Sequence, residues 1–221
     1  MPTGDIKMGE ITVWGRESSS NVQLILWALD ELGLAYNRLD AGYIYGIVDT
    51  PAFLAMNPNG RIPVLIDDGS APIFEAGAIL RYLANKYADD DFWPADAAAR
   101  AEIDKWAEWA KWNFGHSFTV TVFWKLVRTP ADAIDHDDVA KSLDAVEVFL
   151  AMADSQLASS KYLAGDTFSL ADIACGYALY RYYDIDVQRR DLPNLRRYYE
   201  LLCTRPAYRD HVMVSYDELR L

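Results

Sequence analysis

The pattern of apolar residues predicts a strand followed by a helix at the start of the chain. The run Ile11–Trp14 is dense in apolar side chains and is typical of a brief buried strand. Ser20 and Gln23, which follow a polar stretch, have the spacing of a capping box, so we expect Ser20 to cap the next helix. Gly33 is a fitting end for that helix, whose apolar positions recur at helical spacing: Val22, Ile25, Leu26, Leu29 and Leu32.

The segments up to residue 87 predict further strands and helices. Thr50-Pro51 opens a short helix, and Asn57–Gly60 is a strong turn signal. Strands are expected at 34–39, 61–66 and 71–74, the last two as a hairpin, and a helix at 75–87. The resulting order, β-α-β-α-β-β-α, is the thioredoxin-like order, with a parallel pair through the first crossover and an antiparallel hairpin at the end.

The second part of the chain is predicted to be all-helical. Residues 88–95 are acidic, contain Trp93-Pro94 and form a plausible linker. Helical patterns follow at 97–125, 138–157, 169–183 and 195–202. We therefore expect an α/β thioredoxin-like domain at 1–87, a linker at 88–95 and an all-α domain at 96–221.

Composition and charge exclude several classes of function. Of 221 residues 52% are apolar, enough for a sizeable core, and the net charge is −12. Up to Tyr87 there are 6 basic and 10 acidic residues (−4), and after it 15 and 23 (−8), so neither part is basic. Nucleic-acid binding and anchoring on an anionic membrane are not expected.

Cysteine usage and the apolar runs indicate a cytoplasmic protein. Cys175 and Cys203 are far from any C-x-x-C spacing and suggest no disulfide framework, which fits a reducing compartment. The segment Met1–Lys7 lacks the apolar core of a signal peptide, and no apolar run approaches the ~18–20 residues of a membrane span.

Four stretches taken together resemble the glutathione transferases over nearly the whole chain, and the opening is most similar to the bacterial serine-type enzymes. They are residues 14–34, 53–65, 73–83 and 163–173, the last followed by Leu192–Leu195 and Arg205–Ala207. The resemblance implies a homodimer that binds glutathione as co-substrate together with a small hydrophobic electrophile. It also implies a glutathione site made by Arg16, Ser20, Asn21, Arg61, Ile62, Pro63, Glu75 and Ala76.

The polar turn Ser18–Asn21 is the candidate thiolate site. A helix start offers unpaired N–H groups and a positive dipole end, which favour an anion and lower a thiol pKa from its usual ~8.5. If Ser20 is the cap, Ser19 and Ser18 remain as catalytic hydroxyl donors, with Asn21 or a backbone amide as alternatives. The competing interpretation is that these serines only cap the helix. The absence of cysteine in this turn excludes disulfide exchange by its own thiols.

Two further motifs concern the peptide backbone and the γ-glutamyl group. By resemblance, the Ile62–Pro63 bond is expected to be cis, leaving the Ile62 N–H and C=O free to pair with the cysteinyl backbone of glutathione; a tight turn alone is the other interpretation.

The family usually has Glu-Ser where this chain has Glu75-Ala76. Loss of a charge-assisted hydrogen bond of roughly 1.5–3 kcal/mol would weaken glutathione binding about tenfold or more. Arg16 and Arg61 could assist with carboxylates or be ordinary surface charges.

The helical part offers structural motifs and one candidate pocket. Ser169–Asp172 has capping-box spacing and is interpreted as structural, and Cys175 as inert core. Among the aromatic residues between 106 and 124, the resemblance implies that some line the electrophile pocket, and we expect Trp109, Trp112 and Phe118. His116 is interpreted as solvated or packed. Asp135–Asp138 reads as a charge cluster at a helix start, so no metal site is predicted.

The resulting hypothesis is an enzyme of detoxification type that holds glutathione as thiolate and directs it at a hydrophobic electrophile. The alternative is a non-catalytic module of the same fold used for binding or regulation. A maleylacetoacetate-isomerase-like enzyme would have a Ser-Ser-Cys loop, which this chain lacks.

Overall fold

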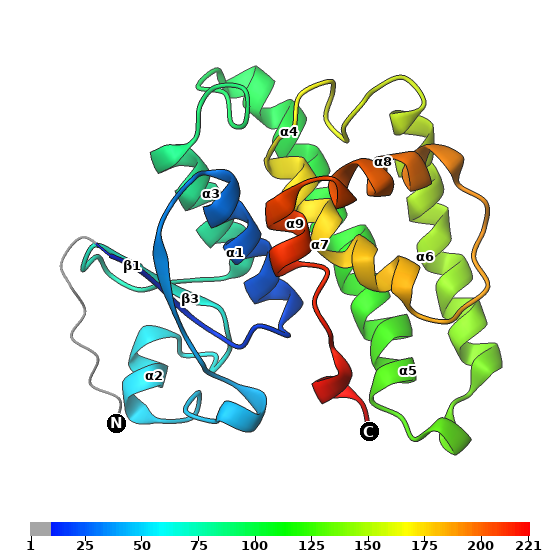
Figure 1. Ribbon diagram of the computed structural model, residues 1–221, viewed down its shortest axis with the longest axis horizontal. Coiled ribbons are helices and arrows are strands. Elements are labelled where there is room, and N and C mark those ends of the chain that lie inside the picture. Colours follow the sequence, from blue (N-terminus) through cyan, green and yellow to red (C-terminus); the bar gives the residue numbers. More distant parts are fainter. Residues whose placement is uncertain (1–9) are drawn as a thin grey trace.

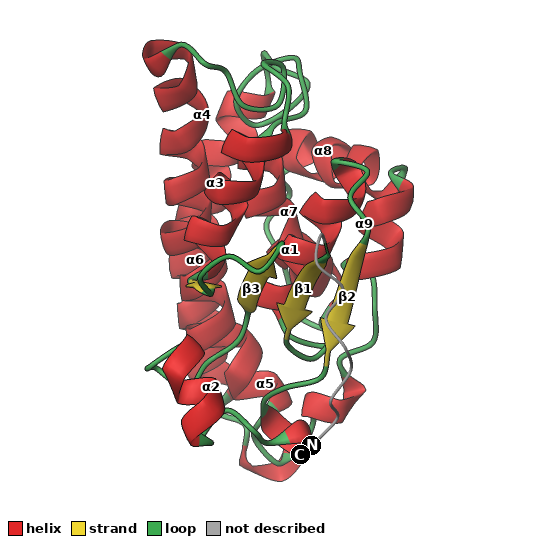
Figure 2. Cartoon of the chain, turned by 90° about the vertical axis from the view of Figure 1, so that its left-hand side faces the viewer, coloured by secondary structure: helices red, strands yellow, loops and turns green. Residues whose placement is uncertain are grey.

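A four-stranded mixed sheet forms the centre of the first part of the chain (Figure 2). The computed structural model describes residues 10–221; the segment 1–9, where no signal peptide is predicted, lies outside them. The strands are β1 (Ile11–Trp14), β2 (Tyr36–Leu39), β3 (Val64–Asp67) and β4 (Ile73–Phe74), in the order β2-β1-β3-β4. β1 and β2 are parallel, whereas β3 is antiparallel to both β1 and β4.

Helices cover both faces of this sheet because its side chains alternate between two cores. Val13 and Leu65, which are paired across β1 and β3, belong to the large core beside α1 (Ser20–Glu31) and α3 (Ala76–Tyr87). The next pair, Trp14 and Val64, faces the smaller core under α2 (Pro51–Met56), around Phe53. The predicted thioredoxin-like order is confirmed.

The second part of the chain is helical, as predicted (Figure 1). Its α-helices are α4 (Ala97–Trp109), α5 (Trp124–Val127), α6 (His136–Leu157), α7 (Leu170–Asp184), α8 (Pro193–Cys203) and α9 (Pro206–His211). Two π-helical segments, η2 (Ala110–His116) and η3 (Thr119–Phe123), interrupt the helix expected at 97–125. α9 was not predicted. In residues 10–221 no helix is long and apolar enough to cross a membrane.

The two predicted capping boxes have different outcomes. The Ser20 box is wrong: Ser19 occupies the N-cap of α1, Ser20 is the first helical residue, and Gln23 Nε2 instead donates to the Glu17 carbonyl at 3.0 Å. The Ser169–Asp172 box is confirmed, with a reciprocal pair of bonds at the start of α7.

Asp172 lies at the buried centre of the helical part. It also accepts a hydrogen bond from Tyr198 Oη at 2.8 Å and one from the Leu163 N–H at 3.0 Å. Burial raises the pKa of Asp172 to about 6, although all these hydrogen bonds act in the opposite direction. Cys175, one turn further along α7, is fully buried, as expected for core.

A buried carboxylate ends β3 and ties the sheet to α3. Asp67 is 3% exposed and accepts hydrogen bonds from Lys86 Nζ and from the hydroxyls of Tyr82 and Tyr87, each at 2.8 Å. Burial alone raises the pKa of Asp67, but these donors outweigh it and hold the pKa below its usual value. The cluster therefore stabilises the fold while Asp67 is ionised.

We predict that Asp67→Asn lowers the free energy of unfolding by about 2 kcal/mol at pH 7, because hydrogen bonds to a charged group are lost. Since the folded-state pKa is depressed, this contribution is complete above the unfolded value near 4 and disappears as pH falls through the folded value. Urea denaturation at pH 7 and at pH 3 measures both effects. Asp68→Asn, on the same turn and exposed, is the control. Equal stability of the two variants at pH 7 would contradict the prediction.

Candidate functional site

A cleft of about 650 Å³ lies between the thioredoxin-like and the helical parts of the chain. Its walls come from the start of α1, the segment before β3, the start of α3, the end of α4 with η2, and α7. The predicted site residues in these walls are Ser20, Asn21, Arg61, Ile62, Pro63, Glu75, Ala76 and Trp112.

One wall is an unpaired stretch of backbone. The Ile62–Pro63 peptide bond is cis, as expected. Within residues 10–221 neither the N–H nor the C=O of Ile62 makes a backbone hydrogen bond, because β3 begins only at Val64. The preceding carbonyl, that of Arg61, accepts from Asn57 Nδ2 at 2.6 Å. This wall can therefore pair with an extended peptide, as an additional strand would.

A second wall is the start of α3. Glu75 occupies the N-cap with φ 70° and ψ 113°, a region that non-glycine residues rarely adopt and that costs about 1–3 kcal/mol. Its side chain makes no capping bond, and Ala76 is the first helical residue. The amides at the start of α3 therefore open into the cleft, where they favour an anion.

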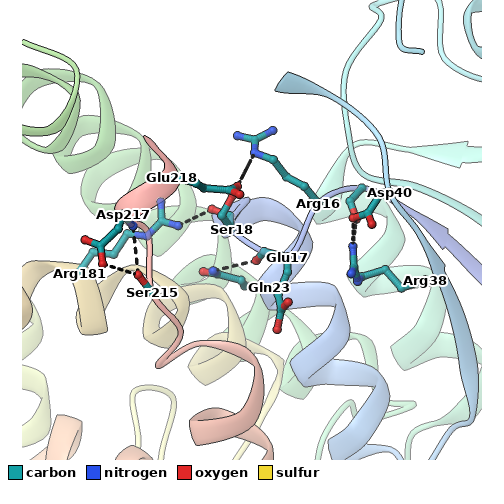
Figure 3. Close-up of polar contacts among 11 residues, drawn as sticks. Arg16, Glu17, Ser18, Gln23, Arg38, Asp40, Arg181, Ser215, Asp217 and Glu218 are labelled. Atoms are coloured by element: carbon teal, nitrogen blue, oxygen red, sulfur yellow. Dashed lines mark hydrogen bonds and ion pairs between the residues drawn. The ribbon is translucent and has the colours of Figure 1, made fainter. Parts of the chain in front are cut away.

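The first serine of the turn before α1, Ser18, faces the C-terminal segment (Figure 3). Ser18 is buried, its hydroxyl donates to Glu218 from the C-terminal end, and Arg16 Nε donates to the same hydroxyl at 3.1 Å. Arg16 also lies 3.8 Å from Glu218. Ser18 and Arg16 therefore do not line the cleft, unlike the other predicted glutathione-binding residues, because both side chains bind the C-terminal segment.

Ser19 and its two successors lie at the first turn of α1. Ser19 is the N-cap, yet its hydroxyl makes no capping bond, so it is free beside the first amides of the helix. Ser20 and Asn21 line the cleft, whereas Ser19 is partly exposed just before them and is not part of its wall.

The helical part contributes a lysine to the same place. Lys111, in η2, donates from Nζ to Asn21 Oδ1 at 2.7 Å, and the Nζ lies 4.8 Å from the ring centroid of Tyr177 in α7. Burial lowers the pKa of Lys111 to about 8, with Glu75 and Glu108 acting in the opposite direction.

A glycine makes room for this arrangement. A Cβ on Gly115 would lie 2.1 Å from the Tyr177 hydroxyl, so only glycine lets the tyrosine reach the cleft here.

The aromatic residues predicted for the pocket have different positions. Trp112 lines the cleft, is 63% exposed and packs edge-on against His116 at 5.1 Å between centroids. Phe118 is fully buried against Phe114 and Tyr182, so the prediction that it lines the pocket is wrong. Trp109 packs on Trp106 and does not line the cleft either.

Comparison with known proteins decides the family. Protein-family models described as "Glutathione S-transferase, N-terminal domain" and "Glutathione S-transferase, C-terminal domain" match residues 9–85 and 116–206. The chain belongs to the glutathione S-transferase family. It is 39% identical to Glutathione S-transferase GstB of Escherichia coli over 205 residues, covering 92% of this chain and 98% of the relative. It is 34% identical to Glutathione S-transferase 3 of Zea mays over 213 residues, covering 93% and 94%.

The fold agrees with that of solved transferases. A theta class glutathione S-transferase from Xanthomonas axonopodis pv. citri with glutathione bound superposes with a TM-score of 0.87 at 41% identity, covering 94% of this chain and 99% of the other. The predicted glutathione transferase family and activity class are confirmed at this level.

Several cleft residues of this transferase were missed by sequence reasoning. They are Asn57, Gly77, Ala78, Arg81, Glu108, Lys111, Gly115, Thr119 and Tyr177, together with His116, which was interpreted as solvated or packed. Lys111 and Gly115 lie in the aromatic-rich stretch between residues 106 and 124. A lysine and a glycine among large apolar side chains were the features of the sequence that could have indicated a site there.

The acidic stretch before α6 has the structural role expected for it. Asp135 Oδ1 accepts from the Asp138 N–H at 3.0 Å and caps the helix. Residues 10–221 contain no group of three or more His, Cys, Asp or Glu side chains placed to hold a metal ion.

Proposed function

We propose that this transferase binds glutathione in the cleft and holds its sulfur as thiolate at the start of α1, for attack on a hydrophobic electrophile. The observation that supports this most is convergence: two helix N-termini and the unpaired Ile62 backbone open into one cleft. An extended tripeptide with an anionic sulfur and a carboxylate fits those three features. The Xanthomonas relative, solved with glutathione bound, supports the same ligand.

Each part of glutathione has a proposed partner. The γ-glutamyl carboxylate lies at the α3 amides beside Glu75 and Ala76, and the cysteinyl backbone pairs with Ile62 beside Pro63. Arg61, exposed at the rim, is placed for the remaining carboxylate. Ser20 and Asn21 form the wall nearest the sulfur, which the dipole of α1 stabilises as an anion.

Ser19 is the proposed hydroxyl donor to the thiolate. Its hydroxyl is not used for capping and stands at the positive end of α1, whereas that of Ser18 is committed to Glu218. Ser20, which lines the cleft, is the neighbouring alternative.

We expect the wild type to conjugate glutathione to 1-chloro-2,4-dinitrobenzene and Ser19→Ala to lose about tenfold or more of kcat/KM at neutral pH. The lost hydrogen bond of roughly 1.5–3 kcal/mol raises the pKa of the bound thiol by about 1–2, so activity returns in part at high pH. The measurement is the pH profile of kcat/KM.

Matched variants decide between the serines. Ser18→Ala should lower the free energy of unfolding by about 1.5 kcal/mol without moving the profile, because a bond to a charged group is lost away from the cleft. A profile moved by Ser20→Ala and not by Ser19→Ala would identify Ser20 as the donor. Unmoved profiles in all three would assign the thiolate to Asn21 or to backbone amides.

Ala76 is where this transferase departs from the usual family residue. We predict that Ala76→Ser lowers the Kd for glutathione about fivefold or more, equivalent to about 1 kcal/mol, because a hydroxyl is restored at the γ-glutamyl carboxylate. Calorimetry measures it, with Ala78→Ser on the same cleft wall as the control. An unchanged Kd would mean that the carboxylate is already fully bound by other groups.

The missing hydroxyl at Ala76 is also the observation that favours the second candidate, a non-catalytic module of this fold. The two candidates differ in one experiment: a module of that kind binds glutathione in calorimetry and shows no turnover with the aryl halide at any pH.

We also propose that the protein acts in detoxification in the cytoplasm and that it forms a homodimer. Large apolar side chains stay exposed on the single chain, among them Tyr43, Ile44, Tyr45 and Leu54 of the thioredoxin-like part. Burying such a surface against a second copy would stabilise the pair. Light scattering at micromolar concentration should give the mass of two chains, and the mass of one chain would contradict the dimer.

A further inference from the structure

Lys111 is the only cleft residue of the helical part that hydrogen-bonds, within residues 10–221, across to the first turn of α1. Its Nζ lies 2.7 Å from Asn21 Oδ1 and over the ring of Tyr177, so it stands beside the proposed thiolate position. An ammonium has three N–H donors, of which Asn21 takes one. The remaining donors are available to a second substrate in the cleft.

The local backbone is built to hold this side chain. Lys111 belongs to the π-helical segment η2, and single π-helical turns inside α-helices are frequent at functional sites. In the same segment Gly115 leaves the space that Tyr177 fills. Without that glycine the ring under the ammonium could not take its place, so the position of Lys111 depends on two features beyond its own side chain.

The surroundings of Lys111 bring the pKa of its ammonium close to neutral pH. Burial lowers its pKa to about 8, Glu75 at the N-cap of α3 and Glu108 of α4 raise it, and Arg81 of α3 lowers it. Tyr177 beneath it stays protonated, because burial raises the pKa of that hydroxyl. At neutral pH the lysine therefore carries a proton that it releases more readily than an exposed lysine would.

We propose that Lys111 is a catalytic residue that donates a proton to the electrophile, and that this fits the transferase to α,β-unsaturated carbonyl compounds. The inference rests on the proposed function. In the step, the thiolate forms a bond to the β-carbon, and the alkene electron pair moves to give an enolate oxygen. The Lys111 ammonium protonates the enolate, and the neutral amine then recovers a proton from water. This proton balances the one that the glutathione thiol released to water when it became a thiolate.

An aryl halide serves as the substrate with which the α,β-unsaturated carbonyl compound is compared. The thiolate displaces halide from it, and this reaction needs no proton donor. We expect Lys111→Arg, which keeps the charge but holds its proton, to lower kcat/KM for acrolein at least ten times more than for 1-chloro-2,4-dinitrobenzene. Lys111→Met should show the same selective loss. The wild-type rate with acrolein should also fall on the alkaline side, where the ammonium loses its proton, and that fall should be absent in Lys111→Arg.

Lys105→Met is the matched control, since Lys105 lies on α4 in an exposed ion pair with Glu102. Thermal unfolding shows whether each variant is folded, and Lys111→Arg serves if Lys111→Met is not. Equal loss on both substrates, or no loss with acrolein, would overturn the proton-donor role. A wild type inactive on both substrates would instead contradict the proposed function.

Discussion

A buried guanidinium joins the helical part of the molecule to the loop where the chemistry is proposed. Arg181 of α7 is 2% exposed and donates from Nη2 to the Ser18 carbonyl at 2.6 Å, one residue before the N-cap of α1. Rings of Phe123 and Tyr216 lie 4.7 and 5.7 Å from its guanidinium carbon. Burial lowers the pKa of Arg181 to about 10, so it stays charged at neutral pH. This bond fixes where α1 begins relative to the helical part, and hence how its free amides face the cleft.

The loop before α1, which Arg181 contacts, is bound by polar groups from two sides. The loop before α1 is held from one side by Arg181 and from the other by Glu218, whose carboxylate faces Ser18 and Arg16. Only the hydroxyls and amides beyond Ser18 remain for a ligand. A rigid loop followed by an uncommitted helix start is the arrangement expected for preorganised stabilisation of an anion.

Sequence reasoning predicted the elements well because they depend on local patterns. The strand Ile11–Trp14 has its predicted bounds, and the box at Ser169 needs only residues three apart. The cis bond before Pro63 followed from resemblance. The contact between Ser18 and Glu218 could not be predicted from local patterns, because the two residues are 200 positions apart in the sequence. Phe118 was misplaced because a helical pattern does not reveal π-helical turns, which change the faces that the following residues occupy.

Those π-helical turns have an evolutionary consequence. A π-helical turn accommodates one residue more than an α-helical turn, so deleting a single residue within η2 would convert that turn to α-helix while the flanking turns keep their faces. Only residues within η2 would change position, among them the cleft residues Lys111, Trp112 and Gly115. Single-residue insertion or deletion in this segment is therefore a short route by which descendants of this chain could acquire a different second-substrate surface on an unchanged glutathione site.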